Sequence, residues 1–128
     1  MIVEDNPTDV FLIREALRAY RLDVDLRVFE DGEEAIHLIQ LLDTDDSQAC
    51  PDLMLVDLNL PRADGFEVLK RLRVSRRCAE IPVIVTTSSA AQPDRERSKS
   101  LGADAYFRKQ VGYEASLEIG GIIKKLLQ

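Results

Sequence analysis

Short apolar runs alternate along this chain with longer segments in which hydrophobic residues recur every three or four positions. The runs are typical of strands buried on both faces of a sheet, and the longer period is typical of amphipathic helices. The expected strands cover residues 1–4, 24–28, 53–56, 81–85 and 104–108. The expected helices cover residues 7–20, 35–42, 66–72, 90–101 and 117–127.

Strict alternation of strands and helices predicts an α/β fold. Such a chain forms a doubly wound parallel sheet with helices on both faces and right-handed crossovers. We expect five strands in the order 2-1-3-4-5, five helices, and one domain over residues 1–128. The first strand would be central in this order, yet only about four residues represent it. We therefore expect that a few residues are missing from its amino end.

Two of the expected helices have unusual sequences. Residues 90–101 are charged and contain no large apolar side chain before Leu101, so this helix should be weakly anchored and mobile. The last helix has a broad apolar face interrupted by Gly120-Gly121. These glycines either permit a close backbone approach or weaken the helix. Its apolar face also supports the hypothesis of a homodimer.

Composition and charge restrict the class of protein. The chain is 45% hydrophobic and 31% charged, as in ordinary globular domains. Its net charge of −6 argues against direct binding of nucleic acid, because nothing offsets phosphate repulsion. No apolar run approaches the roughly 20 residues that span a bilayer. Cys50 and Cys78 lack any framework of further cysteines, which predicts ordinary free thiols and a reducing cytoplasm.

Chemically useful side chains follow the ends of four of the expected strands. Because parallel strands all end at the same edge of a sheet, we expect these side chains to meet there. They are Glu4 and Asp5 after the first strand, Asp57 after the third, Thr87 and Ser88 after the fourth, and Lys109 after the fifth.

Three ionised carboxylates in one pocket repel each other unless a cation is present. Mg²⁺ fits this need, since it takes one or two carboxylates together with water and phosphate oxygens. Lys109 adds a fixed positive charge and Thr87 a hydroxyl donor, which suits a phosphoryl group during transfer. Asp57 is then the expected nucleophile of an aspartyl phosphate.

At this point the sequence resembles the receiver domains of response regulators in two-component signalling. The similarity covers essentially the whole chain. It rests on Val3-Glu4-Asp5-Asn6, Asp57 to Pro61, Asp64-Gly65, Pro82 to Thr87, Gly102-Ala103 and Lys109. The opening residues also resemble the single-domain branch that includes phytochrome-linked regulators. The resemblance implies a flavodoxin-like fold and a cytoplasmic phosphoprotein.

The resemblance also implies a role for each residue of the site. Asp57 would accept a phosphoryl group from a histidine of a sensor histidine kinase. Mg²⁺ would be bound by Asp5, Asp57 and the backbone carbonyl of Asn59, with Glu4 assisting. Lys109 and Thr87 would contact the phosphoryl group.

The same resemblance implies a switch. Thr87 and Tyr106 would shift together and remodel the face of the fourth helix, fifth strand and fifth helix for an unknown downstream protein. The side chains of Asn59 and Ser89 would tune hydrolysis. Such a protein catalyses only its own phosphorylation and dephosphorylation, and is otherwise not an enzyme.

One residue departs from the family pattern. Receiver domains usually have a proline after the lysine, with a cis peptide bond before it, whereas here Gln110 follows Lys109. A cis bond before a residue other than proline costs about 2.5–4 kcal/mol, so we expect a trans bond and a rearranged loop.

Two other functions compete with this interpretation. One is a phosphatase of the haloacid-dehalogenase type, which also forms an aspartyl phosphate. That chemistry usually needs a second acid two residues after the nucleophile, where this chain has Asn59. The other is a receiver-like interaction module that is not phosphorylated, which the departure at Gln110 keeps open.

Overall fold

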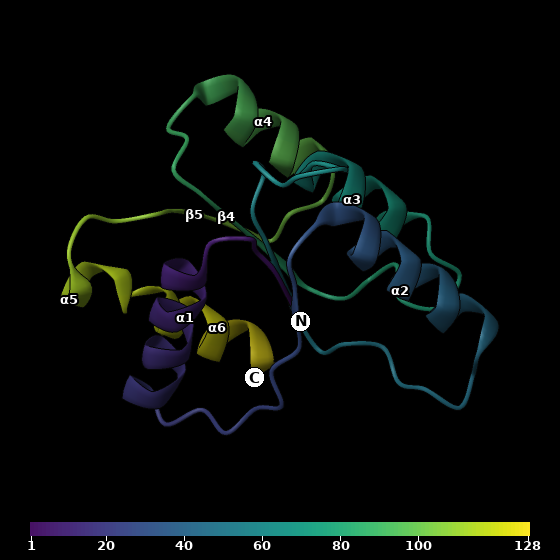
Figure 1. Cartoon of the computed structure of the whole chain (residues 1–128), viewed down its shortest axis with the longest axis horizontal. Helices are drawn as coiled ribbons and strands as arrows, with labels where there is room; N and C mark the ends of the chain where they lie inside the picture. The colour runs from purple at the N-terminus through teal and green to yellow at the C-terminus, as the bar shows by residue number, and fades with distance from the viewer.

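A five-stranded parallel sheet forms the centre of the molecule (Figure 1). The computed structural model describes all 128 residues. The strand order is β2-β1-β3-β4-β5, as predicted. The strands are β1 (Ile2–Val3), β2 (Val28–Phe29), β3 (Met54–Val56), β4 (Val83–Thr87) and β5 (Ala105–Arg108). No helix in the structure is long and apolar enough to cross a membrane.

The helices form one layer on each face of the sheet (Figure 1). Helices α1, α5 and α6 lie on one side, and α2, α3 and α4 lie on the other. Their bounds are α1 (Pro7–Ala19), α2 (Gly32–Thr44), α3 (Gly65–Arg73), α4 (Gln92–Ser100), α5 (Tyr113–Ser116) and α6 (Ile119–Leu127).

Local sequence explains where the helices begin. The side chain of Asn6 caps α1 by accepting a hydrogen bond from the Thr8 N–H, and Pro7 occupies the first helical position. Helix α3 has a capping box in which Asp64 and Glu67 each bind the other's backbone N–H. Because α1 and α3 follow β1 and β3 directly, these caps fix the two loops that carry the acidic residues.

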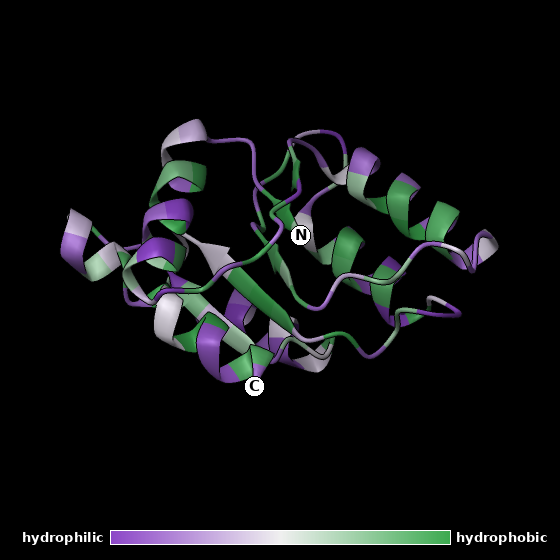
Figure 2. Ribbon diagram, turned by 90° about the horizontal axis from the view of Figure 1, so that it is seen from below, coloured by the Kyte–Doolittle hydropathy of each residue, from purple (hydrophilic) through white to green (hydrophobic).

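Two hydrophobic cores lie on opposite faces of the sheet, since successive residues of each strand point to opposite sides. The larger core joins α2 and α3 to residues such as Val3 and Val56, and the smaller core joins α1 and α6 to residues such as Ile2 and Leu55. Figure 2 shows the hydrophobic colour on the strands and on parts of the helices, while α4 is largely polar in sequence. Only Ser98 of α4 is buried, which agrees with the expected weak anchoring of this helix.

The second strand is shorter than predicted. Residues 24–28 alternate like an edge strand, yet β2 contains only Val28 and Phe29. Its partner β1 has just two residues, which pair with these two. Residues 24–27 therefore have no neighbouring strand with which to form a ladder, and the alternation alone does not make them a strand.

The expected last helix is divided into α5 and α6. Between them, the N–H groups of Glu118 and Gly120 bind carbonyls three residues earlier, at Ala115 and Leu117. This tighter turn separates the two helical segments. The apolar face of α6 still packs against α1, with Ile119 and Ile123 buried.

Gly120 permits a close approach between α6 and the end of α1, which decides between the two explanations for the glycine pair. A Cβ atom on Gly120 would lie 2.2 Å from the Tyr20 ring and 2.9 Å from the Ala16 carbonyl oxygen. A Cβ atom on Gly121 would meet Tyr20 only at 3.5 Å, an ordinary contact. The glycine pair thus packs within the chain.

We expect opposite effects on stability from alanine at these two positions. Gly120→Ala should lower the free energy of unfolding by about 1–3 kcal/mol, because the new methyl group overpacks the interface. Gly121→Ala should raise it by up to about 1 kcal/mol through helix propensity. Urea denaturation of the two variants checks this. Equal effects would contradict the packing argument.

The prediction of free thiols was wrong. Cys50, in the loop before β3, and Cys78, in the loop before β4, form a disulfide with a Cα–Cα distance of 5.7 Å. Adjacent strands β3 and β4 bring these two loops together, although 28 residues separate the cysteines in the sequence. Spacing along the chain gives no sign of this proximity, which depends on strand order.

Candidate functional site

The carboxyl edge of the sheet brings the predicted residues together. Glu4 and Asp5 directly follow β1, and Asp57 follows β3. The Asp57 N–H donates to the Val3 carbonyl at 3.0 Å, which extends the β1–β3 ladder to the site. The Lys109 N–H donates to the Thr87 carbonyl at 2.8 Å and extends the β4–β5 ladder in the same way. The backbone of the sheet thus sets the position of both ends of the site.

The Lys109 ammonium lies among three carboxylates. Its Nζ is 2.7 Å from Glu4 Oε1, 2.7 Å from Asp9 Oδ2 and 2.9 Å from Asp57 Oδ2. Glu4 and Asp57 have side chains only 1% and 7% exposed, whereas those of Lys109 and Asp9 are about one-fifth exposed. One cation therefore neutralises part of a cluster with larger negative charge.

Three carboxylates also form a cluster with the geometry of a cation site. Oxygen atoms of Glu4, Asp5 and Asp57 lie within 4.8 Å of one another. Apart from its ion pair with Lys109, the buried Glu4 Oε1 has no hydrogen-bond partner. This set of hard oxygen donors, with an excess of negative charge, fits a divalent ion such as Mg²⁺.

Burial and charge shift two pKa values in the site. Burial raises the pKa of Glu4 to about 7; the hydrogen bond from Lys109 opposes this rise, and the Asp57 charge adds to it. For Lys109, burial lowers the pKa, but hydrogen bonds to Asp9, Glu4 and Asp57 raise it further than burial lowers it. Lys109 therefore remains a permanent cation.

Sequence reasoning missed Asp9. It lies in the first turn of α1, and its carboxylate accepts a hydrogen bond from Lys109 at 2.7 Å. The sequence does contain a sign that Asp9 is near the site. A helix that begins at Pro7 holds its first turn at the same sheet edge as Glu4 and Asp5. No strand ends at Asp9, so the positions of the strand ends alone do not predict it.

Comparison with known proteins identifies the family. The family model of the response regulator receiver domain matches residues 1–119. The response regulator Rcp1 of Synechocystis sp. is 34% identical over 109 residues, which are 85% of this chain and 74% of Rcp1. This chain belongs to the response regulator receiver family.

Solved structures agree with this assignment. The phosphorylated cyanobacterial phytochrome response regulator RcpA superposes with a TM-score of 0.86 at 32% identity, covering 98% of this chain and 90% of RcpA. The Mn²⁺-bound form of Rcp1 gives a TM-score of 0.84 at 31% identity, covering 97% of this chain and 89% of that one. The predicted flavodoxin-like receiver fold is confirmed, and the receiver domain belongs to two-component signalling.

In this receiver domain, Ser89 links the two predicted switch residues. The Ser89 N–H donates to the hydroxyl of the buried Thr87 at 3.3 Å. The Tyr106 hydroxyl donates to the Ser89 carbonyl at 2.8 Å. A displacement at Thr87 would therefore reach Tyr106 through one residue of the β4–α4 loop.

The two residues expected to tune hydrolysis lie differently. The exposed Asn59 follows Asp57 closely, and its N–H donates to Asp57 Oδ1 at 3.2 Å. The Ser89 hydroxyl instead donates to Asp94 of α4 at 2.7 Å and accepts from the Ala91 N–H. Ser89 is thus bonded to the beginning of α4 in this state of the receiver domain.

Gln110, which stands where receiver domains usually have proline, does not move the Lys109 ammonium away from Asp57. No cis peptide bond occurs in the chain, so the expectation of a trans bond before Gln110 is confirmed. The loop turns at Gly112, whose φ of 102° suits glycine, and Val111 is fully exposed. Lys109 nevertheless reaches Asp57, because its backbone is held by the ladder to Thr87.

Proposed function

We propose that Asp57 accepts a phosphoryl group from a phosphorylated histidine of a sensor histidine kinase in a Mg²⁺-dependent reaction. The observation that carries this proposal is the Lys109 ammonium 2.9 Å from an Asp57 carboxylate that also belongs to a three-acid cluster. Membership of the receiver family supports the choice of phosphodonor. A similar regulator, Rcp1, has been crystallised with Mn²⁺, which supports a divalent ion here.

The transfer requires a nucleophile, a leaving group and compensating charge. A carboxylate oxygen of Asp57 forms the new bond to phosphorus while the phosphorus–nitrogen bond breaks, and the electron pair of that bond returns to the imidazole. Lys109 places positive charge beside the transferred oxygens, where negative charge must be balanced. Asp5, Asp57 and the Asn59 carbonyl, with Glu4 assisting, would hold Mg²⁺, which supplies further positive charge when bound.

Phosphorylation would be read out through Thr87. Its hydroxyl, which accepts from the Ser89 N–H, would donate to the phosphoryl group; a movement of Thr87 would shift the loop at Ser89, and Tyr106 would follow because it is bonded to Ser89. The surface of α4, β5 and the last helices would then change for a downstream protein. Such a change is a two-state equilibrium biased by one phosphoryl group.

We also propose what the domain catalyses, where it works and how it assembles. The domain catalyses only its own phosphorylation and dephosphorylation. It works in the cytoplasm, where the ATP that charges a sensor kinase is found. A homodimer through the last helix remains part of the hypothesis, although Gly120 is already packed against Tyr20 of the same chain.

Intact-mass measurement with a small phosphodonor tests the proposal. With Mg²⁺ and acetyl phosphate, we expect one labile phosphoryl adduct on the wild-type chain and none on Asp57→Asn, because Asp57 is the carboxylate to which the proposal assigns the phosphoryl group. The matched control is Asp52→Asn at the other end of β3, which is exposed and should be labelled normally.

Two results would contradict the proposal. Absence of an adduct from acetyl phosphate and phosphoramidate would favour an interaction module that is not phosphorylated. Rapid multiple turnover of varied phosphoesters would favour a phosphatase. EDTA should abolish labelling of the wild-type chain.

A further inference from the structure

Asp9 makes a contact to which the proposed phosphoryl transfer assigns no role. Its carboxylate has one side-chain hydrogen bond, which it accepts from the Lys109 ammonium at 2.7 Å. The hydrogen bond from the same ammonium to Asp57 is longer, at 2.9 Å. Asp9 is not one of the three carboxylates whose oxygen atoms form the cation cluster. Its contact is therefore with the lysine and not with the metal site.

The Lys109 side chain reaches across one strand to meet Asp57. Strand β4 lies between β5, which precedes Lys109, and β3, which precedes Asp57. The bond from the Lys109 N–H to the Thr87 carbonyl holds the backbone, but it does not hold the side chain. Residues 110–114, which follow, are all exposed. Because a lysine side chain is flexible and loses rotamer entropy in any single geometry, the partners at its end decide where the ammonium lies.

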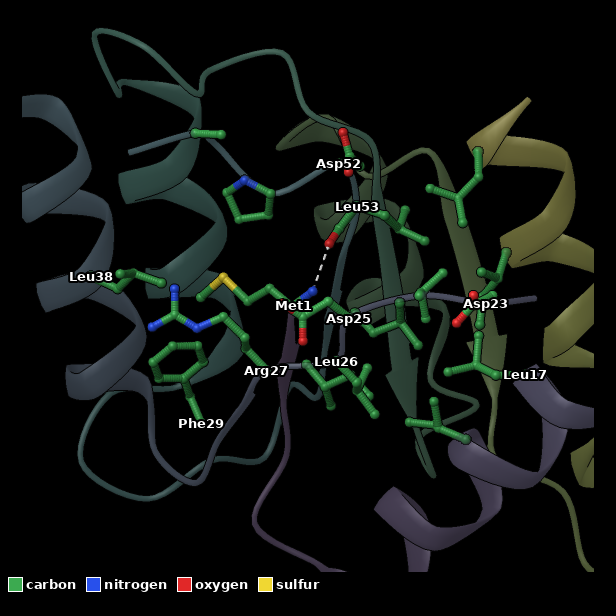
Figure 3. Close-up of a pocket in the computed structure, with 18 of the residues that line it drawn as sticks. Met1, Leu17, Asp23, Asp25, Leu26, Arg27, Phe29, Leu38, Asp52 and Leu53 are labelled. Carbon is green, nitrogen blue, oxygen red and sulfur yellow. Dashed lines mark hydrogen bonds between the residues drawn. The ribbon is translucent and has the colours of Figure 1, made fainter. Parts of the chain in front are cut away.

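A small cavity offers the ammonium another position. The cavity has a volume of about 30 Å³ and is lined by Asp9, Lys109 and Ser116, among other residues, but not by Asp57. A Lys109 side chain that turned into this space would leave Asp57, and loss of the Asp9 carboxylate would enlarge the space. The larger pocket in Figure 3, of about 460 Å³ around Met1, lies at the amino edge of the sheet and is lined by neither Asp9 nor Lys109.

An acidic residue in the first turn of a helix often has a simpler role. It interacts favourably with the helix dipole and needs no other partner. Glu33, in the first turn of α2, fits this description, because its side chain is mostly exposed and lies 3.5 Å from an exposed arginine. The Asp9 side chain is only about one-fifth exposed and ends at an ammonium that follows β5. This position favours a role toward Lys109.

We propose that Asp9 is a positioning residue for phosphoryl transfer, which tethers the Lys109 ammonium beside Asp57. The proposal rests on the phosphoacceptor function proposed above. When Asp57 receives the phosphoryl group, Lys109 exchanges its hydrogen bond to that carboxylate for one to a phosphoryl oxygen and keeps its bond to Asp9. Asp9 itself forms no bond to the phosphoryl group.

Charge and position predict opposite effects for the loss of Asp9. Removal of a negative charge reduces the repulsion of an anionic phosphodonor, which would speed labelling by about fivefold at most. Misplacement of a catalytic group by about 1 Å can slow a reaction by roughly 100-fold. Because solvent screens the partly exposed Asp9 charge, we expect the effect of position to dominate.

Three variants test the proposal through the rate of labelling by acetyl phosphate with Mg²⁺, followed by intact mass. Asp9→Ala should slow labelling by roughly tenfold, because Lys109 loses its tether. Asp9→Asn keeps an oxygen that accepts the hydrogen bond, so its rate should stay within about threefold of the wild-type rate. Glu33→Ala is the matched control for a first-turn acid and should be labelled at the wild-type rate. Urea denaturation checks that each variant is folded at the labelling temperature.

A second measurement follows the lysine itself and does not depend on phosphorylation. In a chain labelled with ¹³C at lysine, the NMR order parameter of the Lys109 ε-methylene should fall in Asp9→Ala. It should stay near the wild-type value in Asp9→Asn. Disappearance of one signal in Lys109→Gln assigns the resonance.

Three results would overturn the proposal. They are an unchanged order parameter in Asp9→Ala, labelling of Asp9→Ala at the wild-type rate or faster, and equal slowing of Asp9→Ala and Asp9→Asn. Slowing of Glu33→Ala by the same factor would also overturn it, since any first-turn acid would then have the effect. A wild-type chain that acetyl phosphate does not label would instead overturn the phosphoacceptor function, and the order parameters would still decide whether Asp9 tethers Lys109.

Discussion

Replacing Lys109 with glutamine is expected to slow phosphoryl uptake from acetyl phosphate by roughly 100-fold and to destabilise the fold. Lys109 is within 2.9 Å of three carboxylates, so its removal leaves them without a counter-charge. Loss of one partner from a largely buried ion pair costs about 3–5 kcal/mol. We expect the lower part of this range, because the Lys109 side chain is one-fifth exposed.

The stability loss should depend on pH when the metal is removed by EDTA. Burial raises the pKa of Glu4 from 4.5 to about 7. Between these values the folded chain binds more protons than the unfolded chain, so the free energy of unfolding falls as pH rises through this window. Without Lys109 the pKa of Glu4 rises further and the window extends upward. The loss of unfolding free energy in Lys109→Gln, relative to the wild-type chain, should therefore be largest above pH 7 and smallest below pH 4.5.

Urea denaturation at several pH values, together with the rate of mass labelling, measures both effects. Lys124→Gln is the matched control, because Lys124 is exposed on α6 and far in sequence from the acidic cluster. It should change neither the labelling rate nor the pH dependence. If Lys109→Gln is labelled at the wild-type rate and its loss of unfolding free energy does not change with pH, the role assigned to this ammonium is contradicted.

The sequence was most informative where side chains follow strand ends. Each apolar run stops at a polar residue, and parallel topology alone brings Asp57, Thr87 and Lys109 to one edge. The fold and the grouping of the site were therefore predictable from local patterns. The role of each residue came from the resemblance to receiver domains.

Features that depend on contacts between distant segments were not predictable in this way. Asp9 reaches Lys109 only because the fold brings the residue after β5 beside the first turn of α1, and Cys50 meets Cys78 only because β3 and β4 are adjacent. The alternation at 24–28 predicts a strand, but the two-residue β1 gives it almost nothing to pair with. In each case a partner far along the chain decides the outcome.

The Cys50–Cys78 disulfide should account for a large part of the stability of the oxidised chain. It closes a loop whose ends are 28 residues apart in sequence. A cross-link of this length restricts the unfolded chain, and the chain-entropy account gives about 3–4 kcal/mol. We expect Cys50→Ser to lower the free energy of unfolding by this amount, measured by urea denaturation without reductant. Cys50 is the better position because it is half-buried, whereas Cys78 is only 1% exposed.

A reductant separates the effect of the cross-link from that of the serine. In dithiothreitol the wild-type chain should lose about the same 3–4 kcal/mol, and its difference from Cys50→Ser should nearly vanish. A difference that persists would assign the loss to packing at Cys50, and two free thiols in the oxidised chain would contradict the bridge. Labelling of Asp57 should survive reduction at low temperature, because the bridge lies in the loops before β3 and β4, at the opposite edge. A reducing cytoplasm would then leave the phosphoacceptor site intact on a less stable domain.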